Sequence, residues 1–86
     1  MLFSFILDKP GDVKATLERL KLKLSDIGGK LTGNENEGYI SAKGFEGTYT
    51  IEAETIKITV TKKPSSIIPN KLIEKQIRGI FKEVCD

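Results

Sequence analysis

Apolar residues recur along this chain with two different periods, and each change of period marks the end of a predicted element. Over residues 2–7 one of two alternating faces is strongly apolar, which predicts a strand. Residues 13–27 then carry apolar residues at steps of four and three, which predicts an amphipathic helix. Gly28 and Gly29 end this pattern, because the left-handed conformation that follows a helix favours glycine. The helical stripe consists of Val13, Leu17, Leu20, Leu24 and Ile27.

After this helix the period returns to two. Residues 39–43, 45–52 and 55–62 predict three strands, and residues 30–32 form a candidate short strand before them. In the last two strands apolar residues share one face and threonines occupy the other, as expected of an antiparallel sheet with one face open to water. Pro69 then fits the first turn of a final helix. Its apolar stripe consists of Ile73, Ile77, Ile80 and Val84, flanked by Leu72 and Phe81.

These elements predict a single α+β domain over residues 1–86, because the chain is too short for a second core. Two amphipathic helices can cover one face of an antiparallel sheet, which gives two layers in the order β-α-β-β-β-(β)-α. Both a helix-grip-like and a ferredoxin-like arrangement fit this order. The choice stays open, because hairpins can be recognised from the pattern but the strand that pairs with residues 2–7 cannot.

Histidine and tryptophan are absent from the 86 residues, and Cys85 is the only cysteine. The sequence therefore offers no histidine base, no metal site rich in histidine or cysteine and no internal disulfide. We expect no cofactor, no catalytic residue and no enzyme. A formal net charge of +2 does not by itself favour nucleic acid. One unpaired cysteine, with no recognisable signal sequence or membrane span, leads us to expect a cytoplasmic protein.

The final helix carries the strongest candidate site. Four basic residues are spaced by four, three and four, so they project within about 60° of one another, opposite the apolar stripe. Such a basic face could follow a phosphate backbone or an acidic partner. An ordinary solvated helix surface explains the same pattern, since Glu74 and Glu83 flank the basic residues and dilute their charge. The four candidate residues are Lys71, Lys75, Arg78 and Lys82.

Other groups of residues have structural explanations. Residues 34–38 superficially resemble a calcium loop, but the glycine is one position late and no glutamate closes the loop, so a polar turn is predicted. Glu52 and Glu54 are expected to be surface charges beside the end of a hairpin. Several aromatic residues could stack nucleic-acid bases on an exposed sheet, but their register with aliphatic residues favours the core. These are Phe3, Phe5, Tyr39, Phe45 and Tyr49.

Residues 44–51, 55–60 and 72–74 form an ordered series with Pro69 and Ile77. They read Gly-Phe-Glu-Gly-Thr-Tyr-Thr-Ile, Thr-Ile-Lys-Ile-Thr-Val and Leu-Ile-Glu. This order resembles the small proteins of the polyhydroxyalkanoic acid (PHA) granule-region family, over nearly the whole chain. The resemblance implies a fold that begins with a strand and a leucine-rich helix, and an association with storage-granule gene neighbourhoods, but no catalytic residues. A histidine often precedes the first helix in that family, whereas this chain has Asp-Lys-Pro-Gly, so the resemblance supports the fold more than a role.

The sequence therefore predicts a non-enzymatic binding or protein-interaction module, with either a small apolar groove or a dimer surface. Its partner would be a protein or a small apolar ligand, and the chain would be a monomer or a homodimer. The alternative is weak binding of nucleic acid or another polyanion through the basic face of the final helix. An enzyme would need carboxylates or tyrosines gathered in a cleft, and it is the least expected of the three classes.

Overall fold

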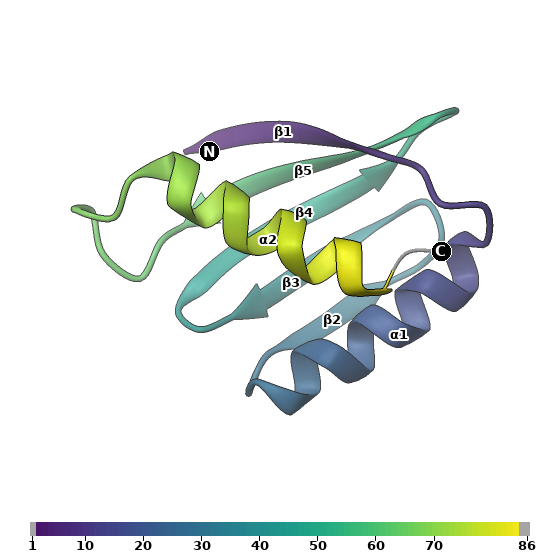
Figure 1. Cartoon of the computed structure of the whole chain (residues 1–86), viewed down its shortest axis with the longest axis horizontal. Helices are drawn as coiled ribbons and strands as arrows, with labels where there is room; N and C mark the ends of the chain where they lie inside the picture. The colour runs from purple at the N-terminus through teal and green to yellow at the C-terminus, as the bar shows by residue number, and fades with distance from the viewer. Residues whose placement is uncertain (1, 85–86) are drawn as a thin grey trace.

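The computed structural model describes residues 2–84 in two layers, a five-stranded antiparallel sheet and two helices that lie on one of its faces (Figure 1). The strands are β1 (Phe3–Asp8), β2 (Lys30–Gly33), β3 (Glu37–Ala42), β4 (Phe45–Ile51) and β5 (Thr55–Lys62). The helices are α1 (Val13–Asp26) and α2 (Asn70–Val84). The predicted α+β class is confirmed, and the candidate strand at residues 30–32 is present as β2.

The strands are ordered β1-β5-β4-β3-β2, and each neighbouring pair is antiparallel. Strands β2 to β5 therefore form a meander, and β1 joins its last strand. Because α1 connects β1 at one edge with β2 at the other, the chain crosses the whole sheet at this point (Figure 1). A ferredoxin-like chain would place its second helix between the third and fourth strands, whereas α2 follows all five. The helix-grip-like alternative describes this order.

The core lies between the sheet and the apolar stripes of both helices. At the start of α1 the Asp12 side chain accepts a hydrogen bond from the Ala15 N–H at 3.0 Å, which satisfies one of the helix's unpaired amides. The helix ends before Gly28, whose φ of 81° is strained for residues other than glycine. The buried apolar residues are Phe5, Leu17, Leu20, Leu24, Leu31, Ile40, Ala42, Phe45, Tyr49, Ile56, Ile58, Val60, Ile73, Ile77, Phe81 and Val84.

The aromatic residues divide between the two faces of the sheet. Phe5, Phe45 and Tyr49 are buried, as predicted, and Phe3 is half-buried against the core. Tyr39 differs, because it precedes Ile40 along β3 and Ile40 faces the helices. The prediction that Tyr39 belongs to the core is therefore wrong. Its side chain lies on the face away from the helices, which we call the open face.

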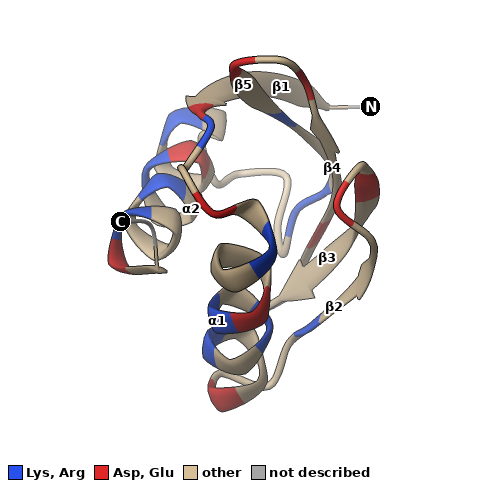
Figure 2. Cartoon of the chain, turned by 90° about the vertical axis from the view of Figure 1, so that its right-hand side faces the viewer, with Lys and Arg blue, Asp and Glu red and all other residues tan. Residues whose placement is uncertain are grey.

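The two helices lie on the same side of the sheet (Figure 2), and two polar contacts join them. The Arg19 Nε of α1 donates a hydrogen bond to the Val84 carbonyl oxygen at 2.8 Å, at the end of α2. A cation at a helix C-terminus complements the exposed carbonyls there. Lys23 of α1 also forms an ion pair with Glu83 of α2. Within residues 2–84 neither helix combines the length and the apolar composition needed to cross a membrane.

Gly79 lies on the exposed side of α2, where a Cβ would meet no atom within 4 Å. No close contact within the described chain therefore requires glycine at this position. Gly79→Ala is expected to raise the free energy of unfolding by about 1 kcal/mol, because alanine loses less backbone entropy in a helix. Gly47 in β4 provides the contrast, because a Cβ there would lie 2.6 Å from the Thr59 carbonyl oxygen, so Gly47→Ala should destabilise the fold. Urea unfolding measures both changes, and a destabilised Gly79→Ala variant would contradict the assignment.

Candidate functional site

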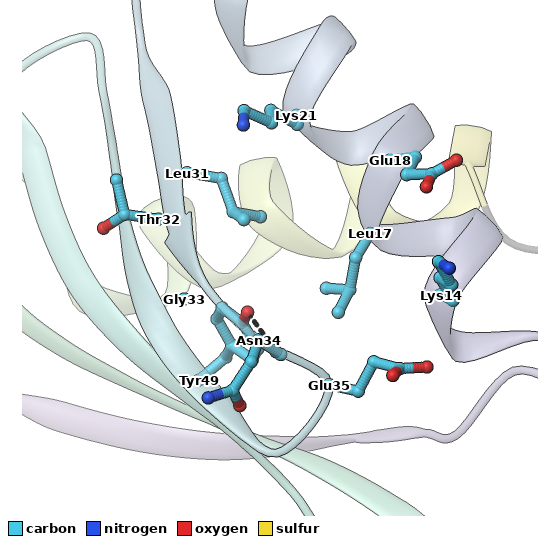
Figure 3. Close-up of a pocket in the computed structure, with 10 residues that line it drawn as sticks. All are labelled: Lys14, Leu17, Glu18, Lys21, Leu31, Thr32, Gly33, Asn34, Glu35 and Tyr49. Atoms are coloured by element: carbon cyan, nitrogen blue, oxygen red, sulfur yellow. Dashed lines mark hydrogen bonds between the residues drawn. The ribbon is translucent and has the colours of Figure 1, made fainter.

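A groove of about 380 Å³ runs between α1 and β2, and we call it the α1–β2 groove (Figure 3). Its floor consists of Leu17 from α1, Leu31 from β2 and Tyr49 from β4. These side chains are 8%, 5% and 1% exposed, so they belong to the core and the groove opens directly onto it. The remaining lining residues are polar, charged or glycine: Lys14, Glu18, Lys21, Thr32, Gly33, Asn34 and Glu35.

The turn between β2 and β3 borders this groove, and Tyr49 holds the turn in place. The Tyr49 hydroxyl donates a hydrogen bond to the Asn34 carbonyl oxygen at 2.6 Å (Figure 3), and burial raises the pKa of this hydroxyl. The Asn34 side-chain oxygen accepts hydrogen bonds from the N–H groups of Asn36 and Glu37 at 2.8 and 3.0 Å. The segment that resembles a calcium loop is therefore a hydrogen-bonded polar turn, as predicted. Gly38 leaves room for the ring, because a Cβ there would collide with Tyr49.

The charges on the rim of the α1–β2 groove are balanced. Lys14 and Lys21 contribute two cations from α1. Glu18 of the same helix and Glu35 of the turn contribute two anions. The rim therefore attracts neither sign of charge in particular, and this groove combines a balanced rim with an apolar floor.

A second groove, of about 320 Å³, lies between the two helices and the turn from β3 to β4, and we call it the α1–α2 groove. Its apolar lining includes Ile27, Phe45 and Ile80, and its charged lining includes Lys23, Lys43, Lys75 and Glu83. Glu83 accepts a hydrogen bond from Lys23 and raises the pKa of its ammonium group, so these two charges offset each other. Lys43 and Lys75 then leave the α1–α2 groove positive, unlike the α1–β2 groove.

The four basic residues predicted on the final helix are all exposed in the structure, but Arg78 differs from the three lysines in its contacts. Lys71, Lys75 and Lys82 are exposed on α2, and Figure 2 shows basic and acidic segments alternating along this helix. Arg78 is turned toward the sheet, with its Nε donating to a Glu74 carboxylate oxygen at 2.7 Å. Its guanidinium also lies 5.0 Å from the centre of the Phe5 ring, within cation–π range. The spacing of Glu74 and Arg78, four residues apart, is the signal for this pair in the sequence.

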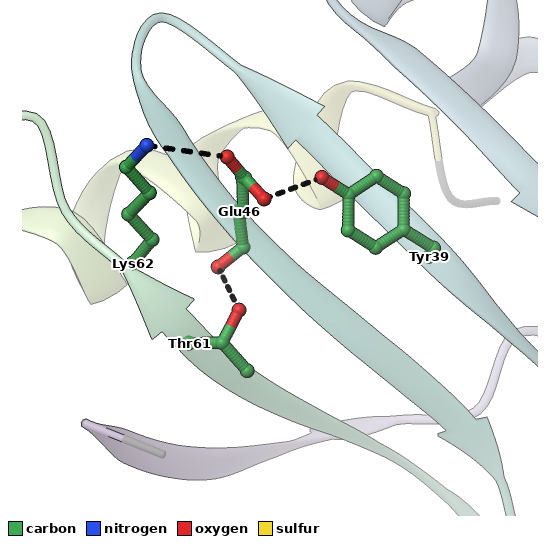
Figure 4. A network of polar contacts seen from close by, with 4 residues as sticks. All are labelled: Tyr39, Glu46, Thr61 and Lys62. Carbon is green, nitrogen blue, oxygen red and sulfur yellow. Dashed lines mark hydrogen bonds and ion pairs between the residues drawn. The ribbon is translucent and has the colours of Figure 1, made fainter.

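The open face carries a polar network that the sequence analysis missed (Figure 4). The Tyr39 hydroxyl donates a hydrogen bond to one Glu46 carboxylate oxygen at 2.7 Å, and Lys62 Nζ lies 3.7 Å from the other. The Thr61 hydroxyl donates to the Glu46 backbone oxygen at 3.2 Å, beside the irregular pairing of β4 and β5 at Glu46 and Gly47. Alternation could have placed Tyr39 here, because Ile40 is its neighbour in β3. The pairing with Glu46 depends on the register between strands.

The remaining candidates contribute no site in the described part of the chain. Glu52 and Glu54 are exposed where β4 turns into β5, as predicted. Cys85 lies outside the described residues. Among residues 2–84 no group of three or more cysteine, aspartate or glutamate side chains is placed to hold a metal ion.

The hydrogen bond to Glu46 is the main reason that the pKa of Tyr39 is raised. The bond requires the protonated phenol, so its stabilising effect is present at neutral pH and is lost as the pH rises through the raised pKa. Glu46→Gln is expected to lower the pKa of Tyr39 toward about 10, because the charged acceptor becomes a neutral amide. An NMR titration of the tyrosine rings measures this, with Tyr49 as the internal reference. Glu37→Gln, on the same strand as Tyr39, is the control. An unchanged pKa of Tyr39 in the Glu46→Gln variant would contradict the assignment.

No family model matches this chain, and no curated protein sequence or solved structure matches it either. The resemblance to the PHA granule-region family therefore stays a prediction.

Proposed function

We propose that this chain is a cytoplasmic, non-enzymatic binding module that takes a small, uncharged and partly apolar ligand in the α1–β2 groove. The observation that carries this proposal is the floor of Leu17, Leu31 and Tyr49, three core side chains at the base of an open groove. Its volume of about 380 Å³ falls within the range of small-molecule sites. The single cysteine of the sequence suits a reducing compartment, which supports the cytoplasmic assignment.

The balance of charge on the rim favours an uncharged ligand. A cation would gain from Glu18 and Glu35 but would be repelled by Lys14 and Lys21, and an anion would meet the reverse. An apolar group, by contrast, gains from every contact with the floor.

The exposed positions of the carboxylates at the groove support binding without catalysis. General acid–base catalysis needs a carboxyl group in a secluded position, where its protonation state can be adjusted to the reaction. Glu18 and Glu35 are both exposed at the rim. The hydroxyl group of Tyr49, a residue of the floor, already donates its hydrogen bond to the Asn34 carbonyl oxygen.

Three amphiphiles with the same chain length test the proposal: 1-octanol, octanoate and octylammonium. In an amide NMR titration we expect 1-octanol to shift the signals of Leu17, Leu31 and Gly33. The two ions should bind no more tightly than the alcohol, because the rim offers no net charge to either. Preferential binding of octanoate with shifts at Lys43 and Gly79 would place the site in the α1–α2 groove and contradict the proposal.

A substitution on the rim distinguishes binding in the groove from nonspecific hydrophobic binding elsewhere on the protein. Glu18→Trp is expected to cover the apolar floor and weaken 1-octanol binding at least about tenfold, since an indole ring fills much of the space that the ligand needs. Ser25→Trp is the matched control, because Ser25 is exposed on the same helix but does not line the groove. Equal effects of the two variants would argue against the α1–β2 groove.

A second candidate function is weak polyanion binding by α2, favoured by the exposed side chains of Lys71, Lys75 and Lys82. Three phosphate contacts with a single-stranded oligonucleotide predict a slope of about −2 in log K against log salt. Lys71→Glu with Lys75→Glu should abolish such binding. Arg78→Gln should leave the affinity nearly unchanged, because Arg78 is held by Glu74 and Phe5. A large loss in Arg78→Gln would restore the four-residue face that the sequence predicts.

A further inference from the structure

The two outer strands of the sheet differ in how well their edges are protected. At one edge, β2 is short, begins with a lysine and ends at Gly33, whose φ is 132°. Short strands, lysine and irregular backbone are the usual means of preventing further strand pairing. At the other edge, β1 spans Phe3–Asp8 and contains no proline, glycine or lysine. Figures 1 and 2 show β1 as the outermost strand, with both helices to one side of it.

The register of the sheet determines which backbone groups of β1 point outward. The Glu52 N–H donates to the Thr55 carbonyl oxygen at 2.8 Å, so the backbone groups of Thr55 point toward β4. Backbone groups alternate in direction along a strand, so those of every second residue of β5, beginning with Ile56, point toward β1. Consistently, the Lys9 N–H donates to the Glu54 carbonyl oxygen at 3.1 Å. Phe3, Phe5 and Leu7 therefore bond to β5, since they pair with Val60, Ile58 and Ile56. The N–H and C=O groups of Ser4, Ile6 and Asp8 point away from the sheet.

Apolar side chains lie along the same edge. Ile6 is 57% exposed and Leu2 is 47% exposed, so both are among the most exposed large apolar residues of the described chain. Ile6 projects from the open face, because it alternates with Phe5 and Leu7 along β1. An unprotected edge with exposed apolar residues is a template for one more strand.

We propose that β1 pairs with β1 of a second copy of this chain, antiparallel, about a two-fold axis that passes beside Ile6. This register places Ile6 opposite Ile6 of the second copy and Ser4 opposite Asp8. All three residues with outward backbone groups then have partners, which a shift of the register in either direction would not allow. The interface joins the two sheets into one and keeps all the helices on the same side.

A second copy fits this edge better than an unrelated peptide, because the strand is complementary to itself. A two-fold axis perpendicular to the sheet makes the two β1 strands antiparallel and keeps their faces aligned. The Ser4 hydroxyl then lies opposite the Asp8 carboxylate, which can accept its hydrogen bond. The two exposed Ile6 side chains cover each other. Because only one strand from each copy takes part, the interface is small and the association is weak and reversible.

Amide hydrogen exchange on the unmodified protein tests the pairing directly. At low concentration the amides of Ser4, Ile6 and Asp8 should exchange fast, while those of Phe5 and Leu7 are protected by β5. Raising the concentration from about 10 µM to about 1 mM, a range that reports weak association, should protect the first three selectively. Sedimentation equilibrium over the same range should show the mass rising toward that of a dimer. A monomer throughout, or a dimer without this alternating protection, would overturn the proposal.

Ile6→Lys provides the second test. It places two like charges opposite each other at the two-fold axis, so the dimer dissociation constant should rise at least about tenfold while β1 remains paired with β5. Leu22→Lys is the matched control, because Leu22 is another exposed apolar residue, 69% accessible, on α1. It should leave the dissociation constant unchanged. A dimer that survives Ile6→Lys, or that Leu22→Lys weakens equally, would show that β1 is not the interface.

Discussion

Antiparallel pairing joins β1 to β5 over six residue pairs, from Phe3 with Val60 to Asp8 with Thr55. Since the first strand stands beside the last, β2 can form only at the opposite edge of the sheet, and α1 has to cross the sheet to reach it. The crossing helix covers part of one face and leaves a groove on each side. The β1–β5 pairing also makes β5 an interior strand, in which Ile58 and Val60 are completely buried. Full burial of one such side chain contributes about 1.5–3 kcal/mol, so this strand is central to the stability of the domain.

Local patterns predicted most of the elements, because burial on one face imposes a period that the sequence must follow. The stripe from Val13 to Ile27 identified α1, and the threonines opposite Ile56, Ile58 and Val60 identified an open sheet face. The same alternation could also have predicted the position of Tyr39. Its neighbour Ile40 is the better core residue, and strict alternation would have placed Tyr39 in solvent. The aromatic residues of this sheet do not share one environment, because the position of each in its strand determines which face it occupies.

The candidate sites were less predictable, because they depend on which elements become neighbours. The period of residues 2–7 indicates which face is buried but not which strand lies alongside. Leu17, Leu31 and Tyr49 meet only because α1 crosses toward the β2 edge and because Gly38 leaves space for the Tyr49 ring. The contact of Arg78 was likewise unpredictable from the local pattern. Its angular position on α2 suits an exposed basic face, but its side chain reaches Phe5 of β1, a strand far away in the sequence.

The α1–β2 groove and the proposed β1 interface lie at opposite edges of the same sheet. The α1–β2 groove lies at the β2 edge, where the short strand and the turn tied by Tyr49 leave side chains as the available contacts. The β1 edge instead presents backbone groups in a regular row, which suits another strand and not a small molecule. Pairing through β1 therefore leaves the α1–β2 grooves of both copies uncovered, at the two outer ends of the joined sheet. Self-association and ligand binding are then compatible, because the strand order β1-β5-β4-β3-β2 separates their surfaces by the full width of the sheet.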